Sequence, residues 1–133
     1  MFRELCFSDT WSSYKNLCCG IKAKEIKDII LVENFKRYFE TLEDSSQEPF
    51  KNKSWRSGQL LFNSLDISNR KHLQEFVKMI MIETVSDILS FVDGTATFKN
   101  QQHPFELMYN GKKVSGSLQE YLLMDLEDNG FHR

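Results

Sequence analysis

Residues 68–92 are the segment that most constrains the fold of this chain. Apolar side chains recur there at intervals of three and four residues over about seven helical turns. This spacing predicts one long α-helix, with Asp66 or Ser68 as its N-cap residue. The polar side of the helix is interrupted by Met79 and Ile82, so we expect it to be covered on more than half of its circumference. The sequence therefore predicts a central, buried core helix.

The chain after this helix predicts a small β-structure and a final helix. Gly94 suits a helix C-terminus because glycine tolerates a left-handed backbone. Thr95–Lys99 and Phe105–Tyr109 contain β-forming residues, and Asn110-Gly111 is typical of a type I′ turn leading into Lys112–Val114. We therefore expect two or three short antiparallel strands.

The last helix is predicted to begin at Ser117. Ser117 and Glu120 match the capping box, in which each side chain accepts a hydrogen bond from the other residue's backbone amide. Apolar residues then line one helix face: Leu118, Leu122 and Leu126. We expect this helix to end around residues 128–130.

The first half of the chain is predicted to be helical, with one ambiguous region. Residues 1–23 predict short helix or irregular structure. Residues 24–42 favour helix, but their apolar residues fall on two faces, which requires a bend near Leu31-Val32 or cover on both faces. A short strand at 29–32 before a helix from Glu33 is the alternative.

A polar loop and a further helix precede the long helix. Residues 43–49 predict an exposed loop. Ser54 is the candidate N-cap of a helix over residues 55–65, in which Leu61 and Leu65 face inward, with Phe62 as a further inward candidate.

Length and composition predict one globular domain over residues 1–133. The chain is 41% hydrophobic and contains eleven phenylalanines, enough to form a core without metal or disulfide support. The elements together predict the α+β class: a mostly helical single domain with a central buried helix and a small antiparallel hairpin or three-stranded sheet near the C-terminus.

Catalytic and metal-binding patterns are not recognisable in the sequence. His72 and Glu75 lie three residues apart on the long helix, but the di-iron motif has the reverse order, and His103 and His132 are scattered. No glycine-rich phosphate loop is present. We therefore expect no catalytic residues, no cofactor and no metal, and interpret the chain as non-enzymatic.

The cysteines leave one enzymatic hypothesis open. The three cysteines, Cys6, Cys18 and Cys19, do not pair evenly, and the favoured interpretation is reduced thiols, which suits the cytoplasm. A nucleophile at Cys18 or Cys19 with a distant histidine is the alternative. No signal peptide or membrane segment is expected.

A short basic stretch gives a nucleic-acid hypothesis. Lys51, Lys53 and Arg56 surround Trp55, a combination that can bind single strands through charge and stacking. The alternative is a solvated loop whose tryptophan packs inward, and the formal net charge of -2 favours it.

Two acidic clusters, in contrast, predict a surface for a basic protein partner. The second cluster also contains apolar residues outside the buried stripe of the last helix, and an apolar centre with a charged rim is typical of interfaces. The predicted interface residues are Glu40, Glu43, Asp44, Glu48, Glu120, Leu123, Met124, Asp125, Glu127 and Asp128.

Three parts of the sequence carry a family resemblance: WRSGQLLFNSL at residues 55–65, the Asp93-Gly94 break with its following strands, and SGSLQEYLLMDLED at residues 115–128. Over roughly its last two thirds the chain resembles small bacterial immunity proteins, which neutralise toxins of contact-dependent inhibition and related polymorphic-toxin systems. The resemblance implies a one-to-one complex with a toxin domain, often a nuclease, whose basic active-site cleft is covered. It assigns no functional residue.

The leading hypothesis is therefore a cytoplasmic, protein-binding immunity protein (antitoxin) without direct contact to membrane or nucleic acid. A small nucleic-acid-binding regulator that uses residues 51–56 is the alternative.

Overall fold

The computed structural model of the chain describes residues 11–44 and 48–132, with side chains from residue 18 onward. Cys6 and the rest of the first ten residues lie outside the described part, as does the middle of the predicted acidic loop. The elements in chain order are α1 (Trp11–Ile26), the π-helix η2 (Lys27–Glu33), α2 (Asn34–Asp44), α3 (Lys53–Ser64), α4 (Ile67–Val92), β1 (Met108–Tyr109), β2 (Lys112–Lys113) and α5 (Leu118–Asn129).

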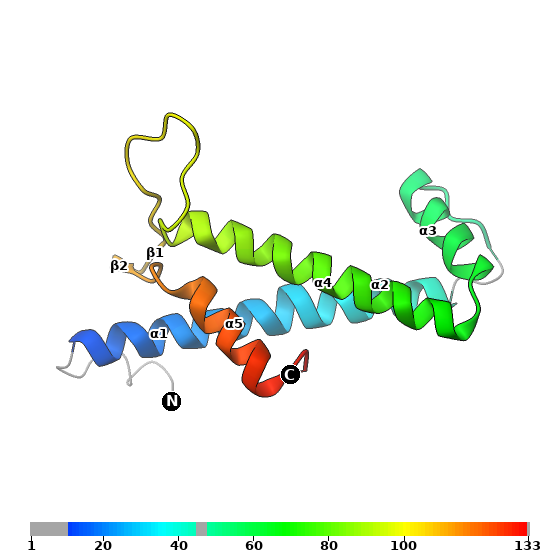
Figure 1. Cartoon of the computed structure of the whole chain (residues 1–133), viewed down its shortest axis with the longest axis horizontal. Helices are drawn as coiled ribbons and strands as arrows, with labels where there is room; N and C mark the ends of the chain where they lie inside the picture. Colours follow the sequence, from blue (N-terminus) through cyan, green and yellow to red (C-terminus); the bar gives the residue numbers. More distant parts are fainter. Residues whose placement is uncertain (1–10, 45–47, 133) are drawn as a thin grey trace.

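Two long helical rods form the frame of the molecule. The first consists of α1, η2 and α2 in direct succession, and α4 returns beside it after the short helix α3 (Figure 1). Helix α5 packs against both α1 and α4. The fold is thus a mostly helical α+β domain with a two-stranded antiparallel sheet near the C-terminus, as the sequence predicts.

The π-helix η2 explains the two-faced apolar pattern of residues 24–42. Buried side chains follow one another at intervals of four residues, namely Cys19, Ala23, Lys27 and Leu31. In an α-helix of 3.6 residues per turn, residues four apart are not directly above one another, so each one is rotated a little further around the helix axis than the one before. The wider turn of a π-helix, closed by i→i+5 hydrogen bonds, rotates them back. The stripe therefore stays on one side, and the alternative strand at 29–32 is not formed.

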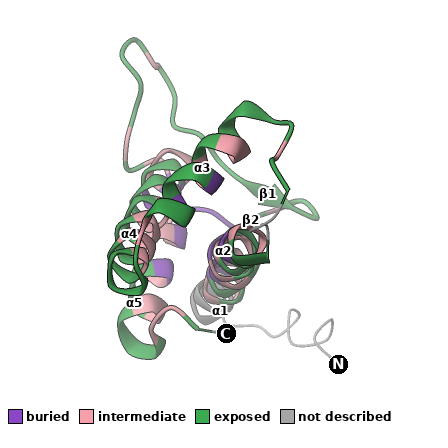
Figure 2. Ribbon diagram, turned by 90° about the vertical axis from the view of Figure 1, so that its right-hand side faces the viewer, coloured by how far each residue is buried: buried purple, intermediate pink, exposed green. Residues whose placement is uncertain are grey.

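The core lies where α1, η2, α4 and α5 meet. Its buried residues are Ala23, Leu31, Leu89, Leu118 and Leu122. Figure 2 shows buried residues on the sides of α4 and of the first rod that face one another. A second, aromatic cluster joins α2 to α3, where the ring centroids of Phe39 and Phe62 lie 6.0 Å apart.

Helix α4 is less buried than its sequence predicts. It begins one residue before the predicted range, and Asp66 caps it by accepting a hydrogen bond from the backbone amide of Asn69 at 2.8 Å. Only Ser86 and Leu89 are buried. The expectation of a central, buried helix is wrong, because α5 and η2 cover one side of α4 and leave the opposite side exposed.

The cap and inward face of α3 also differ from the sequence prediction. The side chain of Asn52, not Ser54, accepts hydrogen bonds from the backbone amides of Ser54 and Trp55. Phe62 is buried whereas Leu61 is exposed. The reason is tertiary: the aromatic residues of α2 lie on the Phe62 side of α3.

The hairpin is shorter than predicted. Met108 pairs with Lys113 and Tyr109 with Lys112, around the left-handed residues Asn110 (φ 49°) and Gly111 (φ 72°). The predicted strand at 95–99 is not formed. Residues 95–107 instead form a long irregular connection, in which the side chain of Gln101 accepts from the amide of Phe98.

The N-terminus of α5 is capped across the fold instead of by its own capping box. Ser117 makes no side-chain cap hydrogen bond. The buried carboxylate of Asp93, at the end of α4, accepts hydrogen bonds from the backbone amides of Gly116 (2.7 Å) and Gln119 (2.8 Å). One side chain thereby fixes the end of α4 to the start of α5, and the predicted capping box at Ser117 is wrong.

This difference is testable by paired substitutions. Asp93→Ala leaves two amides without their acceptor and is expected to lower the free energy of unfolding by about 1–3 kcal/mol. Ser117→Ala serves as the matched control and is expected to change it by less than about 0.5 kcal/mol. Urea denaturation followed by circular dichroism measures both. A larger loss for Ser117→Ala than for Asp93→Ala would contradict the cross-fold cap.

Candidate protein-binding surface

The outer face of α5 brings together four of the predicted interface residues. Leu118 and Leu122 of the same helix are fully buried, so the residues on the opposite side point away from the core. Leu123 and Met124 are 43% and 48% exposed there. We define the α5 face as Glu120, Leu123, Met124 and Glu127, all of which are exposed; Asp128 is exposed beside it.

Asp125 points inward instead. Its carboxylate forms an ion pair with the ammonium of Lys27, whose side chain is only 1% exposed. Asp28, which ion-pairs with Lys24 at 2.6 Å, lies 4.0 Å from the same ammonium. Asp125 therefore ties α5 to η2, and its proposed role at a partner interface is not supported by its position.

The ionisation of Asp125 reflects these contacts. Burial by itself would raise the pKa of the Asp125 carboxyl group. Hydrogen bonds from Lys27 and Asn129, together with the positive charges of Lys27 and Lys24, outweigh burial and lower that pKa below its ordinary value. The carboxylate is thus stabilised in the charged form that the buried lysine needs.

The first acidic cluster does not join the α5 face. Glu40, Glu43, Asp44 and Glu48 are exposed, and Glu40 ion-pairs with Lys36 at 3.6 Å. They lie at the end of α2 and in the loop after it, next to α3, whereas α5 packs on α1 and α4 (Figure 1). The two predicted acidic clusters are therefore separate surfaces.

The tryptophan of the basic stretch is half-buried between two other aromatic rings. Trp55 packs between Tyr38 and Phe50, with ring centroids 5.6 and 5.4 Å away. Arg56 donates a hydrogen bond to the buried side chain of Gln59 at 2.9 Å. Lys51 and Lys53 remain exposed. The inward-packed tryptophan is the arrangement that the sequence offered as the alternative to nucleic-acid contact.

The titratable and thiol residues form no recognisable metal site in the described residues, 11–44 and 48–132. Cys19 is buried, and its thiol donates to the carbonyl oxygen of Val114 at 3.0 Å, while Cys18 is half-buried. His72, His103 and His132 are each exposed. The described geometry therefore supplies no argument for catalysis at Cys18 or Cys19.

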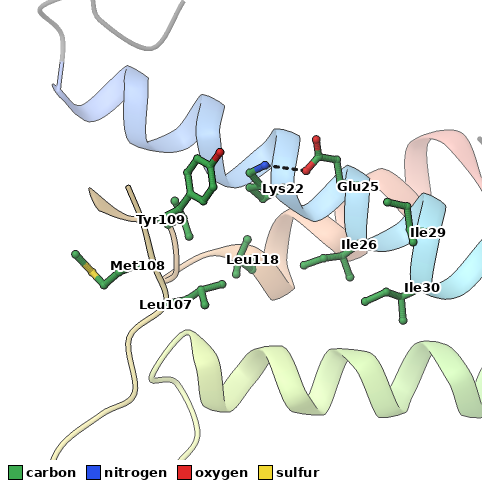
Figure 3. Close-up of a pocket in the computed structure, with 10 residues that line it drawn as sticks. Lys22, Glu25, Ile26, Ile29, Ile30, Leu107, Met108, Tyr109 and Leu118 are labelled. Atoms are coloured by element: carbon green, nitrogen blue, oxygen red, sulfur yellow. Dashed lines mark hydrogen bonds and ion pairs between the residues drawn. The ribbon is translucent and has the colours of Figure 1, made fainter. Parts of the chain in front are cut away.

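An apolar groove that the sequence does not reveal lies between the first rod and the hairpin. Its volume is about 350 Å³, and it is walled by Ile26, Ile29 and Ile30 on one side and by Leu107, Met108 and Tyr109 on the other (Figure 3). At its rim, Lys22 ion-pairs with Glu25 at 2.9 Å. The groove is of a size that accepts apolar side chains or a small apolar ligand. Only tertiary contact places the hairpin beside η2.

Comparison with protein-family models, curated proteins and solved structures finds no match to this chain. None of the described helices is long and apolar enough to cross a membrane.

The Lys27–Asp125 pair gives a stability prediction. Asp125→Ala leaves a buried ammonium without its carboxylate and is expected to cost about 3 kcal/mol or more of unfolding free energy. The double variant Lys27→Met/Asp125→Leu removes both charges and is expected to recover most of that loss. Glu25→Ala, which breaks an exposed pair, is the control and should cost less than about 1 kcal/mol. Equal losses in the single and double variants would contradict a buried pair.

The lowered pKa of Asp125 gives a pH prediction. The unfolded state binds a proton at the ordinary aspartate pKa of about 3.9, whereas the folded state resists it. The stability from this group is therefore fully present above that value and is lost as pH falls through the lower folded pKa. Between about pH 5 and pH 2.5, the wild type should lose more unfolding free energy than Asp125→Asn, as measured by urea titrations. Parallel losses would show that Asp125 contributes nothing to acid sensitivity.

Proposed function

We propose that the chain is a non-enzymatic protein-binding module and that the α5 face contacts the partner. The observation that carries this proposal is the arrangement of α5, in which the exposed carboxylates of Glu120 and Glu127 flank two half-exposed apolar residues on the side opposite the buried leucines. Apolar groups supply binding energy when they are covered, and the carboxylates select partners of positive charge. The helix is fixed in place at its start by Asp93 and in its middle by Asp125.

The partner that fits this face has apolar side chains bordered by lysine or arginine. The most specific form of the proposal is an immunity protein that neutralises a bacterial toxin domain. A nuclease fits this description because its cleft must attract phosphate groups and is therefore basic. The net charge of -2 and the family resemblance of residues 115–128 support this form.

The nucleic-acid alternative requires an aromatic ring that bases can reach. The ring of Trp55 is half-buried between Tyr38 and Phe50, which leaves less of it for a base to stack on. Direct nucleic-acid binding is therefore not the function that we propose.

The proposal predicts that a toxin-type domain is encoded beside the gene of this chain, and that domain is the probe that tests it. Titration calorimetry should show a one-to-one complex. Glu120→Lys/Glu127→Lys is expected to slow association at low salt about tenfold or more, because it replaces attraction by repulsion. Leu123→Ala/Met124→Ala is expected to speed dissociation and to cost about 1 kcal/mol or more.

Glu43→Lys/Asp44→Lys is the matched control, since it reverses two exposed carboxylates on the separate acidic surface. It is expected to leave affinity within about twofold. No complex with this probe, or a larger effect of the control than of the α5 variants, would overturn the proposed face.

A further inference from the structure

The apolar groove between the first rod and the hairpin is a surface that the proposed function leaves unused. Leu118 at its floor is buried, whereas its walls are half-exposed: Ile29 and Ile30 are 56% and 45% exposed, and Leu107 and Tyr109 are 44% and 64% exposed. Figure 3 shows these side chains around one hollow, with Tyr109 at one end and the two isoleucines at the other. Half-exposed apolar side chains that gather around a hollow are typical of a binding site.

The size of the groove favours a small molecule over a protein as its occupant. Its volume of about 350 Å³ falls at the lower end of the range of small-molecule sites, roughly 300–1,000 Å³. The four half-exposed wall residues leave roughly 400 Å² of apolar surface in water, about half of what each partner buries in a stable protein interface. The groove alone is therefore too small for a folded partner and large enough for a ligand.

The shape and lining of the groove favour an unbranched apolar tail. Lys22 at one end and Ile30 at the other are eight residues apart, on the order of 10 Å along a helical backbone. An extended chain of about eight carbon atoms spans this length, because C–C bonds of about 1.5 Å advance in a zigzag. Apart from Lys22, Glu25 and Tyr109, every side chain that lines the groove is apolar.

The polar groups at the Tyr109 end select the head of the ligand. The ammonium of Lys22 lies 5.0 Å from the centre of the Tyr109 ring and donates a hydrogen bond to Glu25 at 2.9 Å (Figure 3). An ammonium has three N–H donors, and the tyrosine hydroxyl is a further donor. Lys112 is the residue paired with Tyr109 across the hairpin, so a second ammonium belongs to this end. A carboxylate, which only accepts hydrogen bonds, complements these donors.

Glu25 competes with such a head group for Lys22. The two side chains are 37% and 54% exposed, and ion pairs that water can reach contribute little free energy. A ligand carboxylate that is held by its apolar tail can therefore share the ammonium or displace Glu25 from it. The hydrogen bond to Glu25 is the main reason that the pKa of Lys22 lies above its ordinary value, so the lysine is positively charged at neutral pH.

We propose that the groove binds a free aliphatic carboxylate, with its head at Lys22 and Tyr109 and its tail along Ile26 and Ile29. The α5 face lies on the side of α5 opposite Leu118, whereas Leu118 itself lines the groove. The ligand site is therefore separate from the surface proposed for a protein partner, and either proposal can fail without the other.

Decanoate, below the concentration at which it forms micelles, is the probe for the tail. Amide NMR titration should show saturable binding with a dissociation constant on the order of 100 μM and shifts at residues 22–30 and 107–109. Ile29→Asp places a charge beside the tail and should weaken binding about tenfold or more. Leu60→Asp is the matched control, since Leu60 on α3 is also 56% exposed and does not line the groove. It should leave the constant within about twofold, and circular dichroism checks that both variants fold.

A second set of variants tests the head group, with 1-decanol as the uncharged ligand of the same length. Lys22→Gln should weaken decanoate binding about fivefold or more and leave decanol binding within about twofold, because only decanoate loses an ion pair. Glu25→Gln removes the competing carboxylate and should strengthen decanoate binding about twofold or more. Lys36→Gln, which removes a lysine from the exposed pair with Glu40 on α2, is the matched control and should change neither constant.

Four results would overturn the inference. They are the absence of saturable decanoate binding up to about 2 mM, an equal effect of Leu60→Asp and Ile29→Asp, an equal effect of Lys22→Gln on decanoate and decanol, and weaker binding of decanoate by Glu25→Gln. Cosedimentation with vesicles of phosphatidylcholine and phosphatidylglycerol separates a free carboxylate from a lipid surface. We expect none, and vesicle binding without decanoate binding would assign the groove to a membrane contact instead.

Discussion

Polar contacts from other elements fix the position of α5. The core of the structure depends on that position, because α5 contributes two of its buried leucines. Lys27, buried in η2, holds Asp125 near the middle of the helix, and Asp93 of α4 holds its first turn. Beyond the helix, Phe131 packs edge-on against Phe35 with ring centroids 5.3 Å apart, and Lys78 lies over both rings. A buried ammonium tolerates few alternatives to its carboxylate partner, so this set of contacts selects one placement of α5. The leucines of α5 then complete the core.

This placement has a functional consequence. A helix fixed at its start, middle and end presents its outer residues without a large loss of conformational entropy on binding. The α5 face gains that rigidity. The four acidic residues of the first cluster, in contrast, lie at the end of α2 and in the loop that follows it. Rigidity and the apolar residues Leu123 and Met124 are the reasons that the proposed contact is placed on α5. Apolar residues of α4 such as Phe76 and Ile80 stay exposed for the same geometric reason, because α5 and η2 cover only part of the circumference of that helix.

Local patterns in the sequence predicted the elements well. The long helix, the turn at Asn110-Gly111 and the final helix follow from spacing and turn chemistry that act within a few residues. Local reasoning failed where the partner group came from far along the chain. Ser117 has the right neighbours for a capping box, yet Asp93 reaches the same amides from another helix. Leu61 and Phe62 are equally apolar neighbours, and only the rings of α2 decide which one is buried. The same limit applies to the candidate site. The sequence predicts that Leu123 and Met124 are exposed, and they are. It does not predict that Asp125 points inward, because the cause is the buried Lys27, which no spacing rule connects to Asp125.

The sequence by itself determined where α4, α5 and the turn of the hairpin form, and it determined that α5 would carry carboxylates beside apolar residues. Hydrogen bonds between neighbouring residues and the periodicity of apolar side chains suffice for those features. Tertiary structure alone decided which faces are covered, that η2 takes the wider π turn, and that the hairpin closes an apolar groove. These outcomes depend on burial and on ion pairs between residues about a hundred positions apart, such as Lys27 and Asp125. The free energy gained by burying a side chain depends on which other elements cover it. It can therefore not be assigned to a residue before the arrangement of the elements is known.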